Sequence, residues 1–159
     1  MQHPSVARAL ARKIRKPFLF VREDMPGFVM PDGTLRLDRV LVPVDSEPDP
    51  QMAIDEVARL EHGLKTPVRV LEALHVGDRP LGFSLATPDL PQVVLNSISR
   101  EGQPERVIPA VARESHADLI VMVYSGPETL SEKWLGSTTE QIVKAAPCPV
   151  LALPEPRYA

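Results

Sequence analysis

The chain has 159 residues, 43% of them hydrophobic, which is the size of one ordinary domain with enough apolar side chains to bury a core. Its formal net charge of -3 gives no overall attraction to nucleic acid or anionic lipid. A single cysteine excludes an internal disulfide and any metal site built from paired thiols. No apolar run reaches the roughly 18 residues of a membrane span and no secretory signal opens the chain, so we expect a cytoplasmic protein.

Short β-branched runs alternate with helical patterns along the chain, which predicts an α/β fold with a parallel sheet covered on both faces. The expected strands cover residues 39–45, 68–76, 92–99, 117–123 and 149–153. The expected helices cover residues 51–62, where Gly63 is a plausible stop, 104–116 and 137–146. Pro109 is expected to shorten or distort the second of these helices.

Residues 77–91 are too rich in proline for a long helix between the second and third strands. One face of the sheet would then have less cover than a doubly wound fold normally has. We expect an N-terminal helix over residues 5–16, or a second copy of the chain, to take part of that role.

The segment 5–21 has the same plan as the segment 137–153, namely a helical pattern, a proline and an apolar strand. Alignment on their prolines matches Leu19 with Leu151. This predicts that residues 1–21 are the last helix and strand of a preceding, similar domain. The alternative is that any helix, proline and strand in this order would look alike.

Residues 22–37 would then be a linker between domains, and residues 38–159 would form the main domain. The linker contains the sequence PDG, which suits the tight turn of a small hairpin. The helical pattern before it carries a basic side made of Arg8, Arg12, Lys13, Arg15 and Lys16. No aromatic residues interleave with these charges, so a solvated face is expected rather than a nucleic-acid surface.

Ligands of open α/β sheets bind at the carboxyl ends of the strands, where the strand order reverses. Asp45 follows the first strand, His75 and Val76 end the second, and a loop runs from Val123 to Ser137 after the fourth. The Asp45 carboxylate can accept hydrogen bonds from an adenine amino group or a ribose hydroxyl. It can equally cap the turn that follows it, and both readings stay open.

The loop before the last helix also has two readings. Gly126 and Gly136 can let backbone N–H groups approach phosphate oxygens at the amino end of the helix that begins near Ser137. Alternatively, Ser137 and Glu140 form a capping box, which needs no ligand to explain it.

The segments RVLVPVD, LHV, ADLIVM and APCPVLAL, with the spacing of Gly126, Gly136 and Ser137, together resemble the universal stress protein family over roughly residues 38–154. The resemblance implies a five-stranded parallel sheet of order 3-2-1-4-5 with an architecture like that of the adenine nucleotide alpha hydrolases, here with an N-terminal helix–strand extension. It also implies dimers that are often joined through the last strand. The family divides into members that bind ATP and members that do not.

ATP-binding members of that family carry G-x-x-G, nine residues, and then G-S or G-T. Carried over to this chain, the first glycine position is Val123, and the loop gains Glu128 and Glu132, so the phosphate end departs from the pattern. The resemblance implies ATP or AMP as the possible ligand. The implied binding positions are Pro43, Val44, Asp45, Val76, Met122, Val123, Gly126, Gly136, Ser137 and Thr138.

We therefore expect a non-catalytic universal stress protein domain that acts in stress response through association and binds ATP weakly or not at all. The alternative is an adenine-nucleotide binding switch. As a homodimer or pseudo-dimer, the chain would pair Phe18, Leu19, Phe20 and Val21 with Val150, Leu151, Ala152 and Leu153.

No enzyme, nucleic-acid, membrane or metal role is expected. Ser137 has no identifiable base and acid partner for a hydrolase triad, so only slow ATP hydrolysis would remain as an activity. His62, His75 and His116 lack the spacing of metal ligands.

Overall fold

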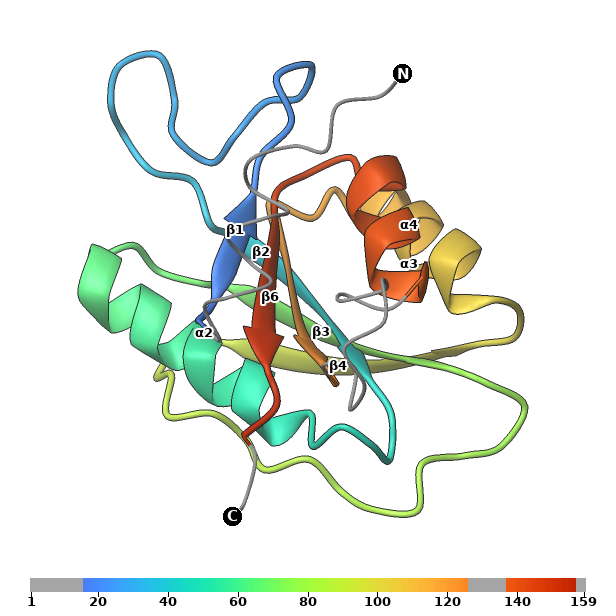
Figure 1. Cartoon of the computed structure of the whole chain (residues 1–159). Coiled ribbons are helices and arrows are strands. Elements are labelled where there is room, and N and C mark those ends of the chain that lie inside the picture. Colours follow the sequence, from blue (N-terminus) through green and yellow to red (C-terminus); the bar gives the residue numbers. More distant parts are fainter. Residues whose placement is uncertain (1–15, 126–136, 157–159) are drawn as a thin grey trace, which may run out of the picture.

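The computed structural model describes residues 16–125 and 137–156, which form one sheet with helices on both faces (Figure 1). The strands are β1 (Phe18–Phe20), β2 (Arg39–Val44), β3 (Val70–Val76), β4 (Val94–Arg100), β5 (Leu119–Tyr124) and β6 (Val150–Pro154). The helices are α2 (Gln51–Leu64), α3 (Pro104–Glu114) and α4 (Ser137–Ala145). The helix expected over residues 5–16 lies outside the described residues, apart from Lys16.

The sheet has six strands in the order β1-β6-β5-β2-β3-β4. The five strands from β2 to β6 are parallel and follow the expected order 3-2-1-4-5. The expected total of five was wrong, because β1 adds a sixth strand antiparallel to β6. Phe18, Leu19 and Phe20 pair with the last strand as expected, but the expected pairing of Val21 was wrong, because β1 ends at Phe20. The pairing covers the backbone groups that β6 would otherwise expose at the sheet edge.

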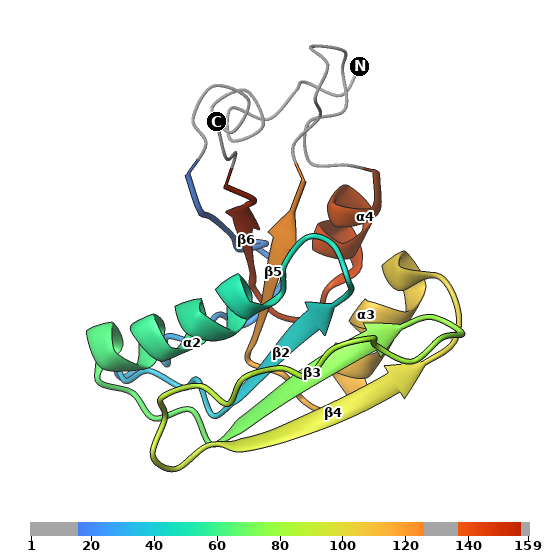
Figure 2. The same ribbon diagram turned by 90° about the horizontal axis from the view of Figure 1, so that it is seen from below.

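Two apolar clusters lie on opposite faces of the sheet, because successive side chains of a strand point to opposite sides. Val42 and Leu71 pack on the face that α2 covers. Leu41 and Ile120 pack on the face that α3 and α4 cover. Figure 2 shows α2 on one side of the sheet and α3 and α4 on the other. Every residue of β5 is buried, as expected for a central strand covered on both faces.

The segment 77–93 has no helix and covers part of the α2 face itself. Leu81, Leu85, Leu90 and Val93 pack against the cluster on that face. Gln51 ties the segment to α2, because its Oε1 accepts a hydrogen bond from the Ala86 N–H at 3.1 Å. Within the described residues, the loop that stands in place of the helix therefore supplies cover for this face, while the expected cover by residues 5–16 or by a second copy stays a prediction.

The boundaries of two helices differ from the sequence expectation. Helix α2 passes through Gly63 and ends at Leu64, where Lys65 adopts φ 52 and its N–H bonds to the Glu61 carbonyl. Pro109 lies buried inside α3, yet the helix continues to Glu114. Neither the glycine nor the internal proline ends its helix.

Residues 21–38, called the strap below, join β1 to β2. Val29 and Leu35 form an isolated antiparallel bridge around a turn in which Gly33 has φ +84. Arg36 Nε lies 3.0 Å from Asp118 Oδ1, which fastens the strap beside the start of β5.

Arg22 fastens the other end of the strap to α4. Its guanidinium donates to the carbonyls of Lys144 and Ala146. It also pairs with Asp24 at 2.9 Å, and this hydrogen bond holds the pKa of Asp24 below its usual value.

Among residues 16–125 and 137–156, none of the helices has both the length and the apolar character that a membrane span needs.

Candidate functional site

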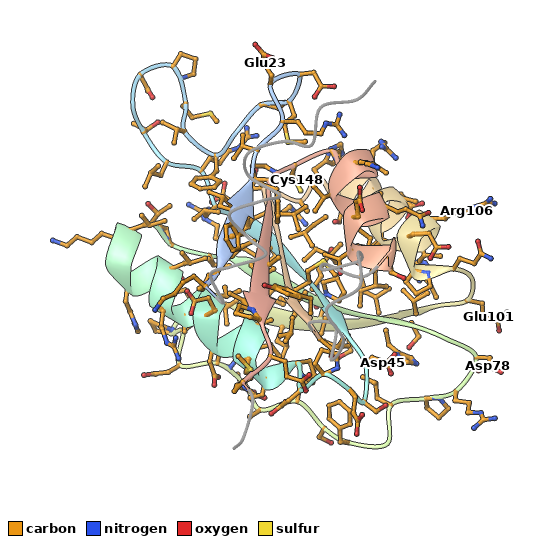
Figure 3. All side chains as sticks on the ribbon, in the orientation of Figure 1. Glu23, Asp45, Asp78, Glu101, Arg106 and Cys148 are labelled. Carbon is orange, nitrogen blue, oxygen red and sulfur yellow. The ribbon has the colours of Figure 1, made fainter. Side chains whose placement is uncertain are left out.

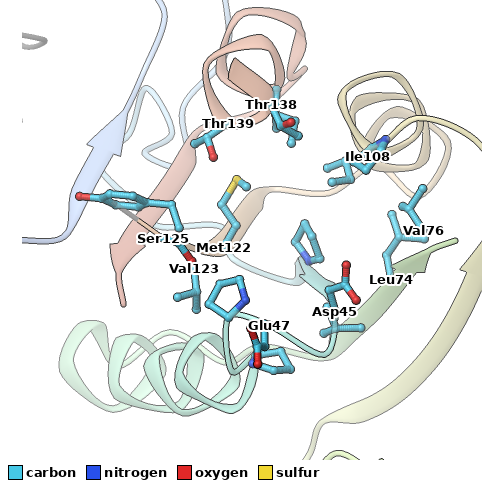
Figure 4. A pocket seen from close by; sticks show the side chains of 17 residues that line it. Asp45, Glu47, Leu74, Val76, Ile108, Met122, Val123, Ser125, Thr138 and Thr139 are labelled. Carbon is cyan, nitrogen blue, oxygen red and sulfur yellow. The ribbon is translucent and has the colours of Figure 1, made fainter. Parts of the chain in front are cut away.

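A pocket of about 350 Å³ lies at the carboxyl ends of β2, β3 and β5 (Figure 4). Strand β2 lies between β3 and β5, so the pocket occupies the point where the strand order reverses. Its volume is near the lower end of the range of about 300–1,000 Å³ that is usual for small-molecule sites. A small ligand, rather than a macromolecule, fits a pocket of this kind.

Seven of the ten binding positions implied by the resemblance line this pocket: Pro43, Val44, Asp45, Val76, Met122, Val123 and Thr138. Gly126 and Gly136 lie outside the described residues, and Ser137 is described only as the first residue of α4. Parallel strands bring their carboxyl ends to one edge of the sheet, so positions after different strands meet there.

The sequence reasoning missed the rest of the lining: Glu47, Pro48, Pro50, Leu74, Pro104, Ile108, Tyr124, Ser125, Thr139 and Ile142. For the lining residues on α3 and α4, the sequence contained one indication. Pro104 and Ile108, like Thr138 and Ile142, are four residues apart and therefore lie on one side of their helix. The packing of α3 against α4, which brings these two sides to one pocket, has no such signal.

The centre of the pocket is apolar. The Met122 side chain lies between α4 on one side and the turn after β2 on the other, with Val76 and Ile108 along a further wall (Figure 4). Thr138 and Thr139 bring hydroxyl groups from the first turn of α4, and Thr139 is 6% exposed. Such walls can hold a ring system and orient it by a few hydrogen bonds.

The charged groups of the described lining are the two carboxylates of Asp45 and Glu47, and no lysine or arginine is among them. Asp45 Oδ1 accepts a hydrogen bond from the N–H of the next residue, Ser46, at 2.7 Å. Ser125 Oγ donates to Glu155 Oε2 at 2.8 Å, which places another carboxylate beside the pocket. Phosphate groups would meet repulsion from these carboxylates.

The described lining also holds no histidine and no cysteine. Within the described residues, the pocket offers apolar contact, hydroxyl groups and carboxylate acceptors.

Residues 83–154 match the Universal stress protein family. The universal stress protein of Methanothermobacter thermautotrophicus is 36% identical over 72 residues, which are 45% of this chain and 49% of that protein. A universal stress protein of Synechocystis sp. is 32% identical over 93 residues, which are 58% of this chain and 55% of that protein. The chain thus spans about half the length of these curated relatives.

Solved structures of universal stress proteins share the fold. One from Archaeoglobus fulgidus gives a TM-score of 0.69 at 23% identity and covers 94% of this chain but 54% of its own. UspA of Lactobacillus plantarum gives 0.56 at 24% identity, over 76% of this chain and 99% of its own. A universal stress protein solved in complex with cAMP gives 0.54 at 17% identity, over 73% of this chain and 95% of its own.

Proposed function

We propose that this chain is a non-catalytic universal stress protein module of the stress response in the cytoplasm, and that it is a pseudo-dimer whose last strand associates with a second unit represented by β1 of the same chain. In this proposal ATP binds weakly or not at all, and neither nucleic acid nor membrane is a partner. The match over residues 83–154 supports the family, and the pairing of β1 with β6 carries the mode of association.

The residue pairs between β1 and β6 are those expected where the same strand of two similar units meets across a two-fold axis. The sequence repeat matches Leu19 with Leu151, and these two residues are direct partners in the ladder. Phe18 pairs with Ala152, and Phe20 pairs with Val150, so exchanging the two repeats leaves the register unchanged. A two-fold axis between two last strands produces this pattern. We infer that residues 1–21 are the last helix and strand of a second universal stress protein unit.

The association is tested in the whole chain with Leu19→Pro. Proline removes a backbone N–H and disrupts the short β1 ladder, which exposes the apolar edge of β6. The variant is expected to form dimers at micromolar concentration, whereas the unmodified chain stays monomeric, as measured by light scattering after size exclusion. Val21→Pro, just beyond the ladder, is the matched control and should behave like the unmodified chain. A Leu19→Pro variant that stays folded and monomeric at every concentration contradicts the proposal.

Weak ATP binding is supported by the acidic lining of the pocket. Calorimetric titration with ATP and magnesium is expected to give no binding tighter than the millimolar range. Glu47→Lys replaces a carboxylate by a cation at the pocket and is expected to raise ATP affinity about tenfold or more. Glu114→Lys, an exposed change of the same kind at the end of α3, controls for net charge. Micromolar ATP binding by the unmodified chain would overturn this part.

The second candidate is an adenine-nucleotide binding switch. It is favoured by the position of the pocket at the reversal of strand order and by the fold it shares with the neighbour solved with cAMP. In this case AMP or cAMP, which carry less charge than ATP, would bind the unmodified chain, and Met122→Arg would abolish the binding by filling the centre of the pocket. Titrations with all three nucleotides separate the two candidates.

A further inference from the structure

The hydroxyl of Thr139 is a buried polar group that faces the pocket. The Thr139 side chain is 6% exposed and lines the pocket, yet its Oγ1 takes part in no hydrogen bond within residues 16–125 and 137–156. Figure 4 shows this hydroxyl directed from α4 toward Met122 at the centre of the pocket. Buried hydroxyl groups in proteins normally have a hydrogen-bond partner, so this one points to a partner that enters the pocket.

The wall opposite α4 carries the negative charge of the pocket. Asp45 and Glu47 lie in the turn after β2, on the side of Met122 opposite to α4 (Figure 4). Asp45 Oδ1 accepts the Ser46 N–H, whereas its Oδ2 has no hydrogen-bond partner among the described residues. No cationic side chain of the described lining neutralises these two carboxylates. A cleft lined by charge of one sign concentrates ligands of the opposite sign.

The space between these two polar ends is apolar. Met122 lies at its centre, and Val76 and Ile108 lie along a further wall. Such walls accept a ring or a short hydrocarbon body. A charged group in this middle part would lose its water without gaining a partner, which is costly. The polar groups of a ligand therefore belong at its two ends.

We propose that the pocket binds a small primary amine with an apolar body and an oxygen atom at its far end. The ammonium group donates hydrogen bonds to the carboxylates of Asp45 and Glu47. The body lies against Met122, and the oxygen accepts a hydrogen bond from the Thr139 hydroxyl. An anionic group in place of the ammonium would meet two like charges, so the pocket selects its ligand by the sign of the charge. This binding goes beyond the association of β1 with β6 and does not depend on it.

Tyramine is a probe that has all three features, and three compounds of similar shape change one feature each. Tyrosol replaces the ammonium by a hydroxyl group, 3-(4-hydroxyphenyl)propionate replaces it by a carboxylate, and 2-phenylethylamine lacks the ring hydroxyl. Each is titrated into the whole chain at low salt, and the NMR signal of the Met122 methyl group reports binding in the pocket itself.

The expected order of affinities follows from the two ends of the pocket. Tyramine should bind with a Kd below about 1 mM and about tenfold more tightly than tyrosol, because only tyramine is a cation. It should bind about threefold or more tightly than 2-phenylethylamine, which leaves the Thr139 hydroxyl unpaired. The carboxylate probe should not bind detectably. High salt should reduce the difference between tyramine and tyrosol, because salt screens the carboxylates.

Two variants test the two ends separately. Asp45→Asn combined with Glu47→Gln should lower the tyramine affinity to that of tyrosol, and Thr139→Val should lower it to that of 2-phenylethylamine. Glu114→Gln, an exposed change at the end of α3, is the control for net charge and should bind tyramine like the unmodified chain.

Equal affinities of tyramine and tyrosol overturn the proposal, and so does tighter binding of the carboxylate probe. A Met122 signal that does not move with tyramine at about 10 mM also overturns it. These measurements use the unmodified chain, so they decide the matter even if a variant fails to fold. None of them changes the outcome of the light-scattering test of association, so a failure here leaves the proposed function standing.

Discussion

Cys148 is a buried thiol shortly before β6, and Figure 3 labels its position. Burial, and secondly the negative charge of Asp118, raise its pKa to about 12. Because the thiolate is the reactive species, a buried thiol of this kind is inert. With 4% exposure it packs as a small buried hydrophobic side chain.

Cys148 is therefore expected to resist thiol reagents while the chain is folded. At pH 8 the folded chain holds about a thousandfold less thiolate than the unfolded chain, so labelling should be slower by at least that factor. Labelling with and without guanidinium, followed by mass spectrometry, measures the ratio. Rapid stoichiometric labelling of the folded chain would show that the thiol is accessible.

The raised pKa of Cys148 also predicts the direction in which the free energy of unfolding changes at alkaline pH. Below pH 9.0, the ordinary pKa of a cysteine thiol, the thiol is neutral in both states, and its contribution to stability is fully present. Between 9.0 and about 12 the unfolded chain ionises and the folded chain does not, so the free energy of unfolding should fall as pH rises. Cys148→Ala should remove that part of the fall, measured by urea denaturation at pH 8 and pH 10.

Individual pocket residues were predictable where they follow a strand. Asp45 and Val76 lie at strand ends, and a parallel sheet brings such ends together whatever the details of packing. Met122 lies inside β5 and was predicted only through the family resemblance. Ile108 and Thr139 were not predictable, because their place in the pocket depends on how α3 and α4 pack. That packing is a tertiary property with no periodic signal in the sequence.

The segment 77–93 lies where the related fold has a helix between β3 and β4. It has no helix of its own, and its leucines pack against the core from an irregular chain. Leu90 is 6% exposed, whereas Phe83 in the same segment is 39% exposed. Leu90→Ala should lower the free energy of unfolding by about 2–4 kcal/mol, because it leaves a cavity under the loop. Phe83→Ala should cost less than about 1 kcal/mol. Urea denaturation compares the two, and equal costs would mean that the segment does not cover the face.

The strands and their order were predictable from short β-branched runs and from the family resemblance, because buried parallel strands read as continuous apolar segments. The absence of a helix before β4 was equally visible, since prolines interrupt the segment. The way this segment covers the sheet was not visible, because Leu81, Leu85 and Leu90 follow neither a helical nor a strand period.

The sixth strand changes which edges the whole sheet presents. β1 is three residues long and lies at the border, while β2 and β5 occupy central positions. Short edge strands open at a lower free energy than central ones. Hydrogen exchange should therefore release the amides of β1 well before those of β2 and β5. If β1 exchanged as slowly as the central strands, it would belong to the cooperative core rather than to an attached edge.

The strap keeps β1 next to the edge of β6, where β1 competes with any second molecule for the same backbone hydrogen bonds. Arg22 and Arg36 fix the two ends of the strap to α4 and to Asp118, so β1 stays close to its partner even when the ladder opens. A short connection of this kind gives an effective local concentration in the millimolar range. A second molecule at micromolar concentration is about a thousandfold more dilute at that edge, so pairing within the chain is favoured over pairing between two chains.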